Sequence, residues 1–93
     1  MNIDRFHNQL AISLGYDHIV NNKSIAIKVE YNNSNVPRIV IKLPEGIKEE
    51  FFASEEPANV YSRLRQPEDM MQVIKEIIEA AHQSYIDAQS SIF

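Results

Sequence analysis

An alternation of apolar and polar side chains limits the folds open to this chain more than any other feature. Apolar residues occupy every second position of residues 23–31 and again of residues 38–43, which is the period of a β-strand with one buried face. Residues 32–35, between the two stretches, are three asparagines and a serine, which favour a turn. We therefore predict an antiparallel β-hairpin.

The alternation also indicates how the two strands pair. A shift of one residue turns a whole strand over, so the register that keeps the apolar side chains together is favoured. That register places Tyr31 opposite Pro37, Val29 opposite Ile39 and Ile27 opposite Ile41. The predicted apolar face consists of Ile25, Ile27, Val29, Ile39 and Ile41. The opposite face is mildly basic and carries Lys28, Arg38 and Lys42 together with Glu30 and Val40.

The C-terminal third of the chain has a helical period instead. Pro67 suits the first helical position, and Glu68 and Asp69 favour the positive end of the helix dipole. One face of this helix is apolar: Met70, Val73, Ile74, Ile77, Ile78, Ala81, Tyr85 and Ala88. At about 100° per residue this arc covers roughly half of the circumference, which is wider than packing on one sheet requires.

The length of the C-terminal helix adds a second constraint. About 22 helical residues span about 33 Å, whereas a strand of eight residues spans about 27 Å. The turns around Tyr85 and Ala88 should therefore extend beyond the sheet. They need cover from the N-terminal helix, from a second copy in a homodimer, or from a partner.

Residues 2–14 predict a short N-terminal helix, because Ile3, Phe6, Leu10 and Leu14 form one stripe and Gly15 stands where helices often end. Residues 47–64 are ambiguous between strand and helix. A two-stranded ribbon is only marginally stable, so we expect a third strand within residues 59–64 and a shorter one near Phe51.

Together these elements predict a single small α+β domain over residues 1–93. Ninety-three residues are too few for two independent cores. The expected architecture has two layers: a short N-terminal helix and a long C-terminal amphipathic helix pack on an antiparallel β-hairpin extended by a third strand.

The composition argues against several kinds of chemistry. The chain has no cysteine, which excludes disulfides, thiolate metal sites and cysteine nucleophiles, and its two glycines cannot form a glycine-rich phosphate loop. His7, His18 and His82 are far apart in sequence; we expect His18 in a surface loop and His82 at the border of the apolar arc. We therefore expect no enzymatic activity, no metal site and no cofactor.

Two further features concern the cellular compartment. No stretch approaches the roughly 20 apolar residues that cross a bilayer. The first residues also lack the apolar segment of a signal peptide. We therefore expect a cytoplasmic protein without a membrane partner.

The net charge of −4 is concentrated in one segment. Between Pro44 and Pro57 there are five glutamates and a single lysine, while the rest of the chain has eight acidic and eight basic residues. Phe51 and Phe52 lie in the middle of this segment. Aromatic groups among acids suit a basic partner surface, because charge steers the encounter and an aromatic ring anchors it. The alternative is that one phenylalanine fills the core and the glutamates keep the segment soluble.

The leading hypothesis is therefore a non-catalytic protein-interaction module, such as an adaptor, an inhibitor or a chaperone-like protein. Its partner would be another protein with a basic surface, and the exposed end of the C-terminal helix would contribute to the contact. The predicted contact residues are Glu49, Glu50, Phe51, Phe52, Glu55, Glu56 and Tyr85.

Two alternatives belong to other classes. A nucleic-acid-associated protein would use Lys28, Arg38 and Lys42 on the basic sheet face, although a pI near 5.2 and the lack of exposed aromatic residues on that face argue against it. A small enzyme would need a pocket that gathers a histidine and carboxylates.

A family resemblance supplies a further alternative. The order of a short helix ending at Leu14 and Gly15, a hairpin, extended chain and a long helix with an acidic N-terminus resembles class I type III secretion chaperones. The resemblance implies a small, acidic, homodimeric α/β protein. It rests on the order of elements, and this chain has no room for the middle helix and some strands of that family. No functional residue is carried over.

Overall fold

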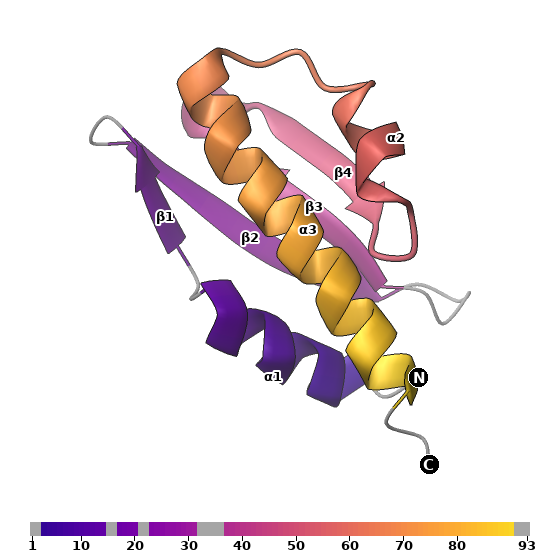
Figure 1. Cartoon of the computed structure of the whole chain (residues 1–93). Coiled ribbons are helices and arrows are strands. Elements are labelled where there is room, and N and C mark those ends of the chain that lie inside the picture. Colours follow the sequence, from indigo (N-terminus) through magenta and orange to yellow (C-terminus); the bar gives the residue numbers. More distant parts are fainter. Residues whose placement is uncertain (1–2, 15–16, 21–22, 32–36, 91–93) are drawn as a thin grey trace.

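The computed structural model describes residues 3–14, 17–20, 23–31 and 37–90, and it confirms the α+β class. Figure 1 shows a sheet with the helices on one side of it. The elements in chain order are α1 (Ile3–Leu14), β1 (Asp17–Val20), β2 (Lys23–Tyr31), β3 (Pro37–Lys42), the 3-10 turn η1 (Pro44–Gly46), β4 (Lys48–Phe52), α2 (Pro57–Tyr61) and α3 (Glu68–Ser90).

The sheet is an antiparallel meander of four strands in the order β1-β2-β3-β4. The predicted register of β2 and β3 is confirmed, with Tyr31 opposite Pro37, Val29 opposite Ile39 and Ile27 opposite Ile41. The link from β3 to β4 turns at Gly46, whose φ of 81° is strained for any residue with a Cβ atom. The predicted turn at residues 32–35 and the predicted helix end at Gly15 lie outside the described residues.

The core lies between the sheet and the helices. Strands β2 and β3 contribute the inward side chains expected from the alternation, and α1 and α3 contribute their apolar stripes. The largest buried side chains of this core are Phe6, Ile25, Ile39, Ile41, Val60, Ile74, Ile77 and Ile78. Complete burial of one such side chain stabilises the fold by about 1.5–3 kcal/mol. Ile27 and Val29, also predicted for this face, are partly buried at its border.

The C-terminal half of α3 packs against α1, as Figure 1 shows. Phe6 and Leu10 of α1 are buried in the core, and so are Ala81 and Ala88 of α3. The N-terminal helix, a second copy and a partner were the three predicted ways to cover the last turns of the C-terminal helix. The structure shows the first of them, contact with α1. The broad apolar arc of α3 follows from its double contact, with the sheet and with α1.

The prediction for residues 59–64 was wrong. They are not a strand: α2 ends at Tyr61 and a turn follows, whereas β4 is the shorter strand expected near Phe51. Pro57 presets the backbone of the first helical turn, and Val60 then buries its side chain in the core. Val60 and Leu64 are four residues apart, which is also a helical spacing, so the pattern could not decide between the two.

Strand β1 was not predicted at all. Its four residues are too few to show an alternation, and the strand is recognised only by its pairing with β2. The prediction that His18 lies in a surface loop was also wrong. Its backbone lies in β1, opposite Ile25.

Candidate functional site

The structure separates the two adjacent phenylalanines that were predicted to anchor a partner. Neighbouring residues of a strand point to opposite faces of a sheet. Phe51, opposite Ile39, is 5% exposed and belongs to the core. Phe52, opposite Arg38, lies on the other face and is partly exposed. The structure therefore places only Phe52 where a partner could contact it.

Phe52 and Glu50 share Arg38 on that face. The Arg38 guanidinium carbon lies 5.4 Å from the centroid of the Phe52 ring, and Nη1 lies 3.5 Å from Oε2 of Glu50. Stacking on the ring and a pairing charge hold the guanidinium in one place. The charge of Glu50 is therefore offset within the chain.

Glu55 stabilises the turn between β4 and α2. Its Oε2 accepts a 3.0 Å hydrogen bond from the Phe52 N–H, and its Oε1 lies 3.0 Å from Nη2 of Arg63. Partial burial raises the pKa of Glu55, but the Phe52 N–H and the Arg63 charge outweigh it, so the pKa lies below its ordinary value. Both interactions favour the ionised carboxylate.

The remaining glutamates of the segment lie apart from each other. Glu49 is partly buried and accepts a 3.1 Å hydrogen bond from Nε2 of Gln66. Glu56 is the exposed N-cap residue of α2, and its side chain makes no capping hydrogen bond there. The residues predicted as one acidic, aromatic contact surface are thus divided among the core, both faces of the sheet and a turn.

Tyr85, the last predicted contact residue, lies on α3. Its ring is partly buried against the core, and its hydroxyl accepts a 2.7 Å hydrogen bond from Nε2 of Gln89. The structure therefore does not bring Tyr85 together with Phe52 or Glu56.

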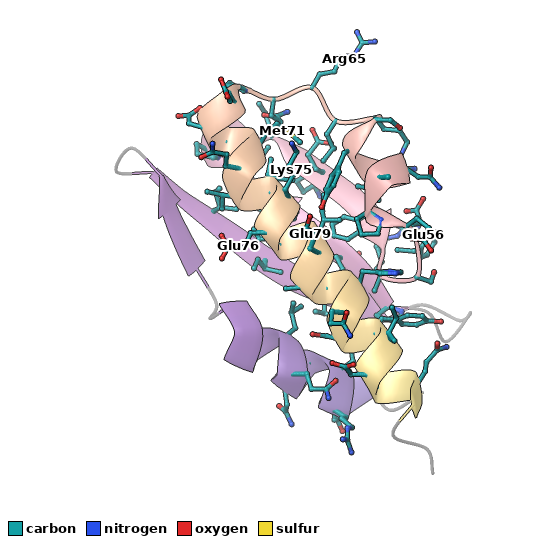
Figure 2. All side chains as sticks on the ribbon, viewed as in Figure 1. Glu56, Arg65, Met71, Lys75, Glu76 and Glu79 are labelled. Carbon is teal, nitrogen blue, oxygen red and sulfur yellow. The ribbon has the colours of Figure 1, made fainter. Side chains whose placement is uncertain are left out.

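A polar contact joins α2 to α3. The Tyr61 hydroxyl donates to Oε1 of Glu79 at 2.7 Å, and Nζ of Lys75 lies 5.6 Å from the centroid of the Tyr61 ring. Figure 2 shows Lys75 and Glu79 on the side of α3 that faces α2, with Glu76 on the other side. Partial burial and the Glu79 carboxylate raise the pKa of Tyr61. The sequence pattern missed this contact because it assigned Tyr61 to a strand.

His7 and His82 lie in different surroundings on two different helices. His82 of α3 is partly buried with Nδ1 3.0 Å from the Ala53 carbonyl oxygen, whereas His7 is exposed on α1. Among the described residues, no group of three His, Cys, Asp or Glu side chains is arranged to hold a metal ion.

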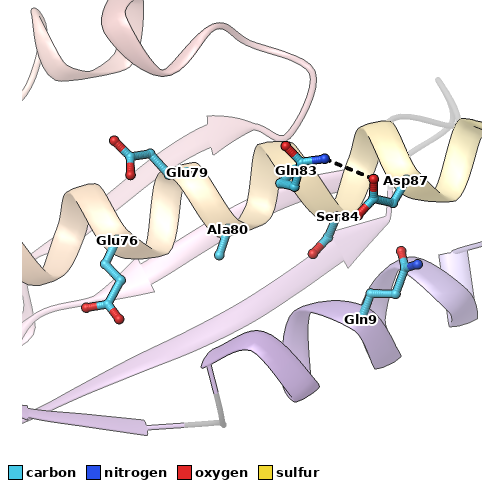
Figure 3. Close-up of a pocket in the computed structure, with 7 residues that line it drawn as sticks. All are labelled: Gln9, Glu76, Glu79, Ala80, Gln83, Ser84 and Asp87. Carbon is cyan, nitrogen blue, oxygen red and sulfur yellow. Dashed lines mark hydrogen bonds between the residues drawn. The ribbon is translucent and has the colours of Figure 1, made fainter.

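A groove of about 560 Å³ lies between α1 and α3. Its lining residues are Gln9 of α1 and Glu76, Glu79, Ala80, Gln83, Ser84 and Asp87 of α3. Figure 3 shows Gln9 and Ser84 directed towards the space between the two helices, Glu76 directed to the same side of α3 as α1, and Glu79 directed away from α1. Most of the α3 residues share one helical stripe, since 76, 80, 83 and 87 are three or four positions apart. The search for apolar periodicity did not identify these residues because most of them are polar.

Some polar groups of the groove have hydrogen-bond partners within the chain, and one does not. Nε2 of Gln83 donates a 2.9 Å hydrogen bond to Oδ1 of Asp87. Oε1 of Gln9, in contrast, is buried and has no hydrogen-bond partner in the described structure. A buried acceptor without a donor costs about 1–3 kcal/mol, so such groups are rare in stable proteins.

The charges of the groove are of one sign. Three of the seven lining residues are carboxylates, and none of the described lining residues is a lysine or an arginine. The groove therefore offers negative potential and hydrogen-bond acceptors, which suit a cationic group that carries N–H donors.

Comparison with known proteins does not assign the chain to a family. No protein-family model, curated protein or solved structure matches it significantly. Among the described residues, no helix is long and apolar enough to cross a membrane.

Proposed function

We propose that this chain is a non-catalytic protein-interaction module that binds a basic segment of a partner protein in the groove between α1 and α3. One observation carries the proposal: a groove lined by carboxylates also contains a buried acceptor, Oε1 of Gln9, that lacks a donor. Both features favour a ligand that brings positive charge together with N–H groups.

Glu76 is the residue on which the charge argument rests most directly. Its side chain is exposed, lines the groove and is directed to the same side of α3 as α1, whereas Glu79 is directed away from α1 and bonds Tyr61. A lysine or arginine of the partner beside Glu76 would form an ion pair there, whereas a lysine in place of Glu76 would repel that group.

Gln9 adds specificity to this contact. The residue as a whole is partly exposed and lines the groove, although its Oε1 is covered. A backbone N–H or a guanidinium group of the partner then supplies the missing donor. Satisfying a buried acceptor recovers the free energy that its isolation costs in the free protein.

The groove replaces the acidic segment as the proposed contact surface. Glu50 and Glu55 have basic neighbours in Arg38 and Arg63, and Phe51 is in the core. The sequence-based hypothesis also proposed that a basic partner contacts the end of the C-terminal helix. The groove lies on the C-terminal half of α3, so the present proposal retains that part.

The test compares two charge reversals of equal size. Glu76→Lys changes the groove, whereas Glu56→Lys makes the same change at an exposed site without a side-chain capping bond. The tagged protein and both variants capture partners from native lysate, and chemical cross-links locate the contact. We expect Glu76→Lys to reduce capture by about tenfold or more and Glu56→Lys to leave it unchanged, with cross-links near Gln9.

A defined probe completes the test. A ¹⁵N-labelled sample is titrated with a lysine- and arginine-rich peptide, and the side-chain amide signal of Gln9 is followed. The proposal predicts a saturable shift of this signal that Glu76→Lys abolishes. Equal capture by both variants, or no shift at Gln9, would overturn it.

A further inference from the structure

In the described part of the chain, one face of the sheet is not covered by a helix. In Figure 1, α1, α2 and α3 all lie on the same side of the sheet. The described side chains on the other side, which we call the outer face, are Ala26, Lys28, Glu30, Arg38, Val40, Lys42, Lys48, Glu50 and Phe52. This group contains four basic and two acidic residues, so the described part of the outer face is positive although the whole chain is acidic.

Lys42 and Lys48 are direct neighbours on the outer face. They lie opposite each other in the register of β3 and β4, and both are exposed. Like charges in directly opposed positions of a sheet are destabilising. Neither lysine forms an ion pair with any described carboxylate, whereas Lys28 lies 3.5 Å from Glu30. A bound anion between the two ammonium groups would remove this repulsion.

An aromatic platform lies on the same face. The Arg38 guanidinium stacks over the Phe52 ring, and both side chains are partly exposed. Along β3, Arg38 is four residues from Lys42, a distance of about 14 Å at 3.4 Å per residue. The side chain between them on this face, Val40, is 1% exposed.

We propose that the outer face binds single-stranded nucleic acid. The phosphates contact Lys42, Lys48 and Lys28, and one base stacks against the Phe52 and Arg38 side chains. A cationic groove or surface beside an aromatic ring is the combination that sequence-independent single-strand binding uses. An acidic protein segment would satisfy the lysines but would not use the platform, so the observations favour the nucleic acid. This inference is independent of the groove between α1 and α3.

The test measures the fluorescence anisotropy of labelled single-stranded 15-mers of dT and of rU at increasing salt concentration. Contacts to three phosphates predict that the logarithm of the binding constant falls with the logarithm of salt at a slope of about −2. The double variant Lys42→Gln/Lys48→Gln should bind at least tenfold more weakly, with a slope of about −0.7 for the one remaining contact.

Two further variants control the interpretation. Arg65→Gln removes an exposed positive charge outside the outer face and should leave binding unchanged. Phe52→Leu keeps an apolar side chain but removes the ring, and should weaken binding by about fivefold, the lower end of the range for one stacked base. Circular dichroism confirms that each variant is folded.

Several results would overturn the proposal. One is the absence of binding of the wild-type chain to either oligonucleotide at about 20 mM salt. Another is a loss of binding in Arg65→Gln as large as that of the double variant. A third contrary result is that polyglutamate binds the outer face, with dependence on Lys42 and Lys48, while the oligonucleotides do not. In that case the partner is an acidic protein surface. Self-association that needs the same lysines, without oligonucleotide binding, would assign the outer face to a second copy.

Discussion

The Tyr61 hydroxyl donates a 2.7 Å hydrogen bond to Oε1 of Glu79, which joins α2 to α3 across 18 positions of sequence. Helix α2 has five residues, too few to be stable alone. It is held by this polar contact and by the burial of Val60 in the core. Stability of the α2 region should therefore respond to changes in a single hydroxyl group.

Replacing Tyr61 by phenylalanine tests that contact. The ring remains while the donor is lost, so we expect the free energy of unfolding to fall by about 0.5–1.5 kcal/mol. Urea denaturation measures the change. Glu79→Gln keeps an acceptor oxygen and should cost less than Tyr61→Phe. If Tyr61→Phe is as stable as the wild type, the hydrogen bond does not contribute in solution.

The same contact predicts a loss of stability in alkaline solution. Partial burial and the Glu79 carboxylate raise the pKa of Tyr61 above its ordinary value of 10.0. Above pH 10 the unfolded chain releases this proton while the folded chain keeps it, so the folded state binds more protons and the free energy of unfolding decreases with pH. Below pH 10 the contribution is complete.

The measurement compares wild type and Tyr61→Phe from about pH 8 to pH 11, a range that brackets the pKa of an unperturbed tyrosine. The stability difference between the two proteins should shrink as the pH rises through 10. A difference that stays constant would show that the Tyr61 proton is held equally in both states.

The two adjacent phenylalanines should differ sharply in their effect on stability. Phe51→Ala empties a core position and should cost about 3–5 kcal/mol, which is a large part of the stability of a small domain. Phe52→Ala removes a partly exposed ring and should cost much less. Thermal unfolding of the two variants measures this, and equal losses would mean that both rings are buried in solution.

Reversing one charge on the outer face should stabilise the fold. Lys48→Glu converts the repulsive pair with Lys42 into an attractive one, and the expected gain is about 0.2–1 kcal/mol. Lys75→Glu has the same change of charge on α3 and serves as the control, which should not be stabilising because Lys75 lies over the Tyr61 ring. Urea midpoints compare them, and a destabilised Lys48→Glu protein would refute the expected repulsion.

Replacing Gln9, whose Oε1 lacks a hydrogen-bond partner, should affect stability and partner binding in different ways. Gln9→Leu removes a buried acceptor without a donor, and leucine has a similar helix propensity, so the free energy of unfolding should stay the same or rise. Capture of the proposed basic partner should fall at the same time. A clear loss of stability would show that Oε1 of Gln9 has a hydrogen bond in solution, such as one to water.

The sequence was most informative where a repeat of two or of 3.6 residues extended over several positions. The pairing of Val29 with Ile39 followed from parity together with the short predicted turn between the strands, because a shift of one residue would put apolar side chains in water. Helix α3, of 23 residues, followed from an apolar stripe that runs from Met70 to Ala88. Strand β1 and helix α2 have four and five residues, so neither completes enough repeats to be recognised.

The candidate contact residues were less predictable because they depend on which groups meet in space. Glu55 finds Arg63, Glu50 finds Arg38, and the adjacent Phe51 and Phe52 lie on opposite faces of β4. Sequence alone located the negative charge between Pro44 and Pro57 but not the positive side chains beside it. Gln9 of α1 and Glu76 of α3, which line one groove, are 67 positions apart in sequence.

The sequence by itself determined the α+β class, the register of the hairpin and the long amphipathic helix, because these depend on local periodicity and on hydrophobic burial. The tertiary structure decided which surfaces remain open to a partner. It packed the C-terminal half of α3 against α1, paired two of the five glutamates of the acidic segment with arginines, and left a groove between α1 and α3. Such outcomes depend on distances between residues far apart in the chain, and only packing determines those distances.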